Sequence, residues 1–157
     1  MVLAGDADVR IGIELLPAQA VASSSAARLV MLGDVYVRAA MDQFRRLTIA
    51  LVGIGALQPS VMLANSGNAF TSDELRDLAR RGAVGDIGLR FFDREGCPVH
   101  GPLDDRVISI TLEELQATPR AIAVAGGDRK VEAIRACLRG KLVNMLVTDK
   151  FTAEKLL

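Results

Sequence analysis

Two glycines and a lysine follow an apolar run late in the chain, in a pattern that could bind an anion. The run Ala121–Ala125 is followed directly by Gly126 and Gly127, and Lys130 comes three residues later. Glycine permits positive φ and lets a ligand approach the backbone amides. Unpaired amides at the start of the next helix, together with the lysine charge, favour a negatively charged ligand. An ordinary strand-to-helix turn with a solvated lysine has the same pattern.

Two further apolar runs end in residues of a similar kind. Thr48–Gly53 is followed by Gly55, and Val143–Val147 is followed by Thr148 and Asp149. Short apolar runs are typical of strands buried in a parallel sheet. Ligands of open α/β sheets bind outside the carboxyl ends of such strands. We therefore expect the three strand ends to converge on one ligand site, although Gly, Thr and Asp are also common turn and cap residues.

Asp86 is a further candidate ligand residue. It lies between Gly85 and Ile87 in an otherwise apolar stretch, where a carboxylate either faces a ligand or bonds to the amides of a turn. Arg90 and Arg106 are better explained by ion pairs at the surface or in a hairpin. A polar segment that could reach ligand hydroxyl groups, but usually forms a turn, contains Asn65, Ser66 and Asn68.

The remaining reactive side chains favour neither catalysis nor metal binding. The single histidine, His100, has no nucleophile and carboxylate at a recognisable spacing, so we expect no catalytic residue. Cys97 and Cys137 do not have the spacing of a zinc site. We interpret both as packing residues of a reduced protein, and we expect no metal and no cofactor.

Length and charge limit the classes of function. The chain has 157 residues, half of them hydrophobic, which is enough for one domain with a core. Its 19 basic and 19 acidic residues cancel, so the charge pattern of a nucleic-acid binder is absent. Neither a leader peptide nor a long apolar run is found, and we expect a cytoplasmic protein without membrane contact.

Caps and periodicity outline the elements that must position these residues. We predict helices at 26–32, 35–44, 75–81, 112–118, 131–139 and 153–157, and strands at 49–53, 121–125 and 143–147. Thr71 and Thr111 begin capping boxes, Asp34 caps the second helix, and Thr152 is expected to cap the last one. Residues 83–92 have an extended pattern, and a turn at 93–96 completes a small hairpin. The alternation predicts an α/β fold with a mostly parallel, Rossmann-like sheet and flanking helices.

The ordered motifs resemble a known family. The segments 52–55, 82–87, 91–96, 106–108, 125–140 and 146–153 are similar, in order and spacing, to the sugar-binding domain of the SorC/DeoR-type bacterial transcriptional regulators. The resemblance implies a fold like those of ribose-5-phosphate isomerase, glucosamine-6-phosphate deaminase and CoA transferases, used to sense a phosphorylated sugar. The ligand-binding residues that it implies are Gly53, Gly55, Asp86, Gly126, Gly127 and Lys130.

By motif position, the resemblance implies that Asp86 faces sugar hydroxyl groups and Lys130 faces a phosphate. It also implies a homo-oligomer that contacts DNA only through a helix-turn-helix domain absent from this chain. Residues 1–157 are then expected to form a single, partial sugar-binding domain that is truncated on its N-terminal side.

Two other classes of function stay open. One is a sugar-phosphate isomerase or deaminase of the related fold, in which Asp86 acts as a general base. The other is an oligomerisation partner that binds no ligand.

Overall fold

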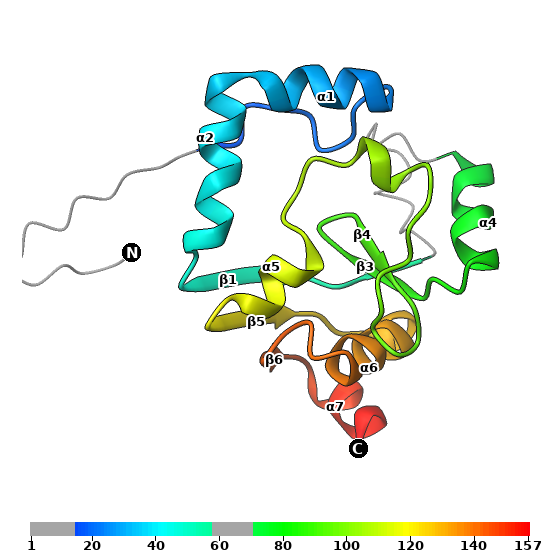
Figure 1. Ribbon diagram of the computed structural model, residues 1–157. Helices are drawn as coiled ribbons and strands as arrows, with labels where there is room; N and C mark the ends of the chain where they lie inside the picture. Colours follow the sequence, from blue (N-terminus) through cyan, green and yellow to red (C-terminus); the bar gives the residue numbers. More distant parts are fainter. Residues whose placement is uncertain (1–14, 58–70) are drawn as a thin grey trace, which may run out of the picture.

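The computed structural model describes residues 15–57 and 71–157 as an α/β fold (Figure 1). Two helices, α1 (Ser25–Gly33) and α2 (Val35–Gln43), come first and are followed by the 3-10 turn η1 (Phe44–Arg46). The side chains of Ser24 and Asp34 cap the two helices, which confirms the predicted helix starts.

The main sheet is parallel, as predicted. Its strands are β1 (Ile49–Gly53), β5 (Arg120–Val124) and β6 (Met145–Val147), in the order β1-β5-β6. The register aligns the last residues of the three strands side by side. The carboxyl ends of these strands therefore lie at one edge of the sheet, where ligand sites of such folds occur.

A smaller antiparallel sheet contains β2 (Gly55–Ala56), β3 (Gly85–Ile87) and β4 (Arg90–Phe92), in the order β2-β3-β4. The prediction that residues 83–92 form one extended segment is wrong, because the chain reverses at Gly88 and Leu89. Their φ values of +56° and +67° form a tight hairpin turn that the apolar pattern did not indicate.

The predicted turn at 93–96 is confirmed. The Gly96 amide donates to the Asp93 carbonyl at 2.9 Å, and the Asp93 amide donates to the Cys97 carbonyl at 2.9 Å. An antiparallel bridge between Phe92 and Pro98 follows from this turn. The segment after β4 thus folds back on the small sheet.

The later helical elements are α4 (Ser72–Arg80), η2 (Asp104–Arg106), α5 (Leu112–Ala117), η3 (Asp128–Lys130), α6 (Val131–Arg139) and α7 (Lys150–Leu156). Both predicted capping boxes, at Thr71 and Thr111, are confirmed. The prediction that Thr152 caps the last helix is wrong, because Asp149 is the N-cap of α7. Thr152 lies inside that helix and is only 1% exposed.

One face of the main sheet packs against α5 and α6. Ala50, Ala121 and Ala123 are buried there in one core cluster with residues of both helices, such as Leu115 and Ile134. Residues of the opposite face are exposed by 72% at Leu51, 50% at Val124, 49% at Met145 and 55% at Val147. Nothing in the described ranges covers this apolar face, although parallel sheets are usually covered on both sides.

Candidate functional site

The loop between β5 and η3 forms the first part of the candidate site. Gly127 has a φ of +99° and a ψ of 150°, a backbone conformation that is essentially restricted to glycine. The predicted positive φ is therefore confirmed for Gly127 but not for Gly126, which is outside that region. Gly126 meets a steric requirement instead, because a Cβ atom there would overlap the Asp149 carboxylate.

Thr152 connects this loop to α7. Its Oγ1 accepts a hydrogen bond from the Gly127 amide at 2.7 Å and donates one to Asp149 Oδ2 at 2.7 Å. The Gly127 amide is thus bonded within the protein and is not available to an anion in this conformation. The hydroxyl and amide of Thr152 also hold the pKa of Asp149 below its usual range.

The 3-10 turn η3 changes the expected helix start. The Lys130 amide donates to the Gly127 carbonyl at 2.9 Å, and the Asp128 carboxylate pairs with Lys155 at 2.5 Å. Part of the predicted anion-binding backbone is therefore already bonded. The Lys130 side chain is half-buried and forms no hydrogen bond or ion pair with the described residues. Its ammonium group and the exposed guanidinium of Arg129 are the cations that this turn offers to a ligand.

Asp86 lies on β3 opposite Gly55 of β2. A Cβ atom at Gly55 would overlap the Asp86 carboxylate, so the glycine leaves room for that group. Asp86 Oδ2 accepts a hydrogen bond from the Leu89 amide at 3.1 Å, which establishes the turn role that the sequence left open. Burial raises the pKa of the Asp86 carboxyl, while the Leu89 amide and the charge of Lys130 act to lower it.

These contacts, together with the strand register, bring all six predicted ligand residues to one end of the main sheet. Asp86 adjoins Gly55 and lies within the electrostatic reach of Lys130, and Lys130 is bonded to Gly127 beside Gly126. Gly53 is the last residue of β1 and pairs with Val124, but no described atom lies within 4 Å of the position of a Cβ atom there, so no steric requirement for glycine is found. We define the strand-end cluster as the set Gly55, Asp86, Gly126, Gly127, Lys130, Asp149 and Thr152.

A cleft of about 370 Å³ lies beside β2 and η3, and its lining contains none of the described residues of the strand-end cluster. Its lining includes Ala56, which follows Gly55, and Arg129, which precedes Lys130. The complete lining is Ala56, Leu57, Ala83, Val84, Arg94, Arg129 and Glu132. A volume of this size is within the range of small-molecule sites.

Sequence reasoning overlooked the roles of Asp149 and Thr152. An Asp three residues before an amide that it caps is a recognisable N-cap pattern, so the function of Asp149 could have been found. No local signal indicates the bond between Thr152 and Gly127, which are 25 residues apart. The predicted polar segment with Asn65, Ser66 and Asn68 lies outside the described residues.

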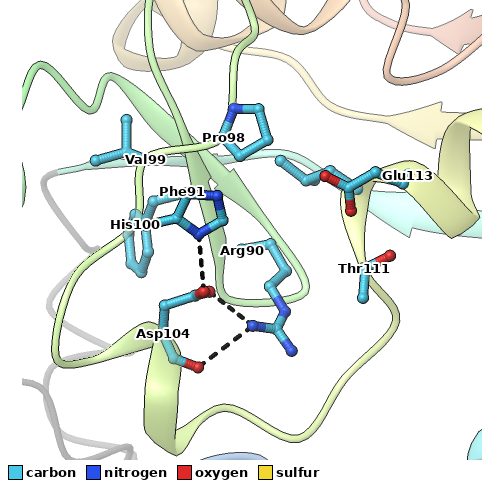
Figure 2. Close-up of a pocket in the computed structure, with 9 residues that line it drawn as sticks. Arg90, Phe91, Pro98, Val99, His100, Asp104, Thr111 and Glu113 are labelled. Atoms are coloured by element: carbon cyan, nitrogen blue, oxygen red, sulfur yellow. Dashed lines mark hydrogen bonds and ion pairs between the residues drawn. The ribbon is translucent and has the colours of Figure 1, made fainter.

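A second, smaller cavity of about 80 Å³ lies beside β4 and η2 (Figure 2). Arg90 is 8% exposed there, and its Nη1 donates to Asp104 Oδ1 at 2.6 Å. His100 Nδ1 lies 3.1 Å from Asp104 Oδ2, and the Glu113 carboxyl adds a further acidic group to the lining. The Arg90 guanidinium is paired with Asp104 in this cavity, whereas Lys130 of the strand-end cluster forms no ion pair with the described residues, so the strand-end cluster suits a phosphate better.

The predicted ion pairs of both candidate arginines are confirmed. Arg106 Nη1 lies 2.6 Å from Glu74 Oε1, and Arg90 pairs with Asp104. The Arg90 pair is largely buried rather than at the surface, since the side chains of Arg90 and Asp104 are only 10% and 25% exposed. Both arginines thus hold together elements that are distant in sequence.

The two cysteines differ in environment. Cys137 is buried as predicted, and burial raises the pKa of its thiol to about 12. The prediction that Cys97 is also a packing residue is wrong, because it is exposed just after the 93–96 turn.

Among residues 15–57 and 71–157, no three His, Cys, Asp or Glu side chains lie close enough to hold a metal ion. No helix in those ranges has the length and apolar character of a membrane span.

Comparison with known sequences gives consistent matches. The family model Sugar-bind, which describes a sugar-binding domain, matches residues 5–157. The deoxyribonucleoside regulator of Bacillus subtilis is 33% identical over 141 residues, covering 90% of this chain and 44% of the relative. The transcriptional regulator LsrR of Klebsiella pneumoniae is 35% identical over 156 residues, covering 98% of this chain and 48% of the relative. The chain spans about half the length of these curated relatives, which are regulators rather than enzymes.

Solved structures agree with the fold. A transcriptional regulator from Streptococcus pneumoniae superposes with a TM-score of 0.81 and 35% identity, over 90% of this chain and 54% of that one. The full-length sorbitol operon regulator SorC from Klebsiella pneumoniae gives a TM-score of 0.79 and 30% identity, over 87% of this chain and 44% of that one. The parallel sheet, the small antiparallel sheet and the flanking helices are thus an arrangement found in solved regulators.

Proposed function

Since this chain belongs to the sugar-binding domain family of the SorC/DeoR-type transcriptional regulators, we propose that it senses a phosphorylated sugar at the carboxyl ends of its parallel strands. The single observation that supports this proposal most strongly is the placement of Asp86 and Lys130, because Asp86 pairs with Gly55 of β2, and β2 contacts the turn η3 that ends at Lys130. Asp86 provides a hydrogen-bond acceptor for sugar hydroxyl groups, and Lys130 provides a cation for the phosphate.

The two side chains suit the two ends of a sugar phosphate. Lys130 forms no ion pair with a described carboxylate, so its charge is available to an anion. Asp86 uses Oδ2 for the Leu89 amide, while Oδ1 on the Gly55 side accepts no hydrogen bond from the described residues. A carboxylate oxygen of this kind accepts hydrogen bonds from sugar hydroxyl groups. The cleft beside β2 and η3, lined by the chain neighbours Ala56 and Arg129, is the space that we assign to the rest of the ligand.

Replacing Lys130 with glutamine is expected to weaken sugar-phosphate binding by about tenfold or more, because a charge-assisted bond to the phosphate is lost. Binding of pentose and hexose phosphates by the wild-type chain and the variant would be measured by calorimetry at two salt concentrations. The variant should also show a smaller salt dependence. Lys141→Gln, which makes the same charge change at the opposite end of α6, is the matched control and should bind normally. Equal affinity of the two variants would remove Lys130 from the phosphate site.

Asp86→Asn is expected to weaken binding while slightly raising thermal stability. Asparagine keeps an oxygen for the Leu89 amide but removes a charge that burial disfavours. The folded-state pKa of Asp86 lies above its unfolded value, so ionisation of this carboxyl reduces stability as the pH rises through the unfolded value. Calorimetry and thermal unfolding at pH 7 test the two effects separately. A variant that binds sugar phosphates as tightly as the wild-type chain would leave Asp86 only its turn role.

The remaining proposals concern the whole regulator. We propose that residues 1–157 act as one effector domain, that sugar binding alters contacts between copies of the regulator, and that this changes DNA binding in the cytoplasm. The balanced charge of 19 basic and 19 acidic residues supports a separate DNA-binding domain rather than direct contact by this one. The deoxyribonucleoside regulator and the sorbitol operon regulator among its relatives support a small sugar-related effector.

A further inference from the structure

The start of α7 is attached to the strand-end loop through side chains on one face of the helix. Thr152 accepts the hydrogen bond of the Gly127 amide at 2.7 Å, and Lys155, one turn later, pairs with Asp128 at 2.5 Å. Thr152 is 1% exposed, so its hydroxyl is shielded from water. The loop and the helix are therefore joined at two consecutive residues of the loop.

Asp149 determines how the Thr152 hydroxyl is used. A hydroxyl has one proton to donate, and here it goes to Asp149 Oδ2 at 2.7 Å. Asp149 Oδ1 also accepts the Thr152 amide at 2.9 Å, which fixes the carboxylate at the helix start. The hydroxyl lone pairs are then free to accept from Gly127. An ionised carboxylate thus orients a buried hydroxyl, which in turn holds a backbone amide.

The peptide units of Gly127 are held on both sides. Its amide is bonded to Thr152, and its carbonyl accepts the Lys130 amide at 2.9 Å. The hydrogen bonds of Gly127 therefore connect the backbone of Lys130 to Thr152 of α7. Gly127 has a φ of +99°, a conformation that a residue with a side chain would adopt only with strain.

We infer that Thr152 and Asp149 are positioning residues of the sugar-phosphate site, which hold the Gly126–Gly127 loop in the shape that presents Lys130 to its ligand. This inference rests on the proposed function. Ligand binding at Lys130 and attachment of α7 to the loop should then stabilise each other, because coupling between two sites is reciprocal. Effector binding would then stabilise the attachment of α7 through Gly127, without a direct contact between the effector and α7.

The inference is tested with Thr152→Val, Thr152→Ser and Asp149→Asn in the full 157-residue chain. Valine has nearly the shape of threonine but lacks the hydroxyl, and serine restores the hydroxyl. Asp149 is exposed, so Asp149→Asn leaves the core unchanged. This variant keeps the inference testable if Thr152→Val fails to fold. The first measurement is the rate of hydrogen exchange of the Gly127 amide without ligand. The second is the affinity, by calorimetry, for ribose 5-phosphate and other pentose and hexose phosphates.

We expect Thr152→Val and Asp149→Asn to speed Gly127 exchange and to weaken sugar-phosphate binding about tenfold, with Thr152→Ser close to wild type. Faster exchange with unchanged affinity in these two variants would overturn the inference while leaving the proposed function intact. If the wild-type chain binds none of the sugar phosphates, the proposed function fails and the inference fails with it. Equal loss of affinity in the serine variant would also contradict it, because that variant keeps the hydroxyl.

Discussion

Arg90→Met is expected to destabilise the fold by about 3 kcal/mol, at the lower end of the cost of breaking a buried ion pair. Methionine fills much of the space of the arginine stem but leaves the Asp104 carboxylate, which is 25% exposed, without its guanidinium partner. Arg90 Nη2 also donates to the Val107 carbonyl at 3.3 Å, so a second contact is lost. Equilibrium unfolding in urea measures the free energy of unfolding of the two proteins.

Arg94→Met is the matched control for this experiment. Arg94 pairs with Glu132 at 2.7 Å, but the two side chains are 76% and 58% exposed. Exposed pairs contribute about 1 kcal/mol or less, so this variant should unfold close to the wild type. Similar unfolding free energies for the two arginine variants would show that burial of the Arg90 pair does not govern its contribution.

The destabilisation caused by Arg90→Met should depend on pH. Burial opposes ionisation of Asp104, but hydrogen bonds and charges from His100 and Arg90 prevail and hold its pKa below the usual value. A lowered folded-state pKa adds stability above the unfolded value of about 3.9, and this stability is lost as the pH falls through the folded value. The difference between wild type and Arg90→Met should therefore shrink below about pH 4.

Gly96→Ala is the second substitution with a large expected effect. Gly96 has a φ of +78°, and a Cβ atom there would lie 2.5 Å from Gly140 Cα and 2.7 Å from the Ala136 carbonyl oxygen. Both neighbours are backbone atoms at the end of α6, so they cannot move aside as a side chain could. Backbone strain and overpacking together should cost about 3 kcal/mol or more. The measurement is again urea unfolding.

Gly82→Ala separates the two contributions. Gly82 has a φ of +91°, but no described atom lies within 4 Å of the position of its Cβ atom. This variant should show only the conformational cost of about 1 kcal/mol. If Gly96→Ala is no less stable than Gly82→Ala, the overlap of a Cβ atom at position 96 with the end of α6 has no energetic cost.

Most helices and strands of this protein were predictable from the sequence, because their signals are local. The capping boxes at Thr71 and Thr111 involve a glutamate three residues later, and the bounds of α6 agree with prediction. Three uninterrupted apolar runs indicated the parallel sheet and hence the edge at which its strand ends meet. The proposed ligand residues Asp86 and Lys130 were singled out from the sequence because their neighbours are glycines and apolar strands, and their ligand role stays a prediction.

The details of the site depended on contacts between distant residues. Thr152 was expected to cap a helix, but the fold places its hydroxyl against Gly127, 25 residues earlier. Arg90 became buried because Asp104, 14 residues away, supplies its counter-charge. The amino-acid sequence alone determined the strands of the parallel sheet, most caps and the edge where those strands end, since these depend on hydrogen bonds and periodicity within a few residues. Tertiary structure alone decided which polar groups are already bonded and which remain available to a ligand, because burial and pairing arise only when separate segments pack together.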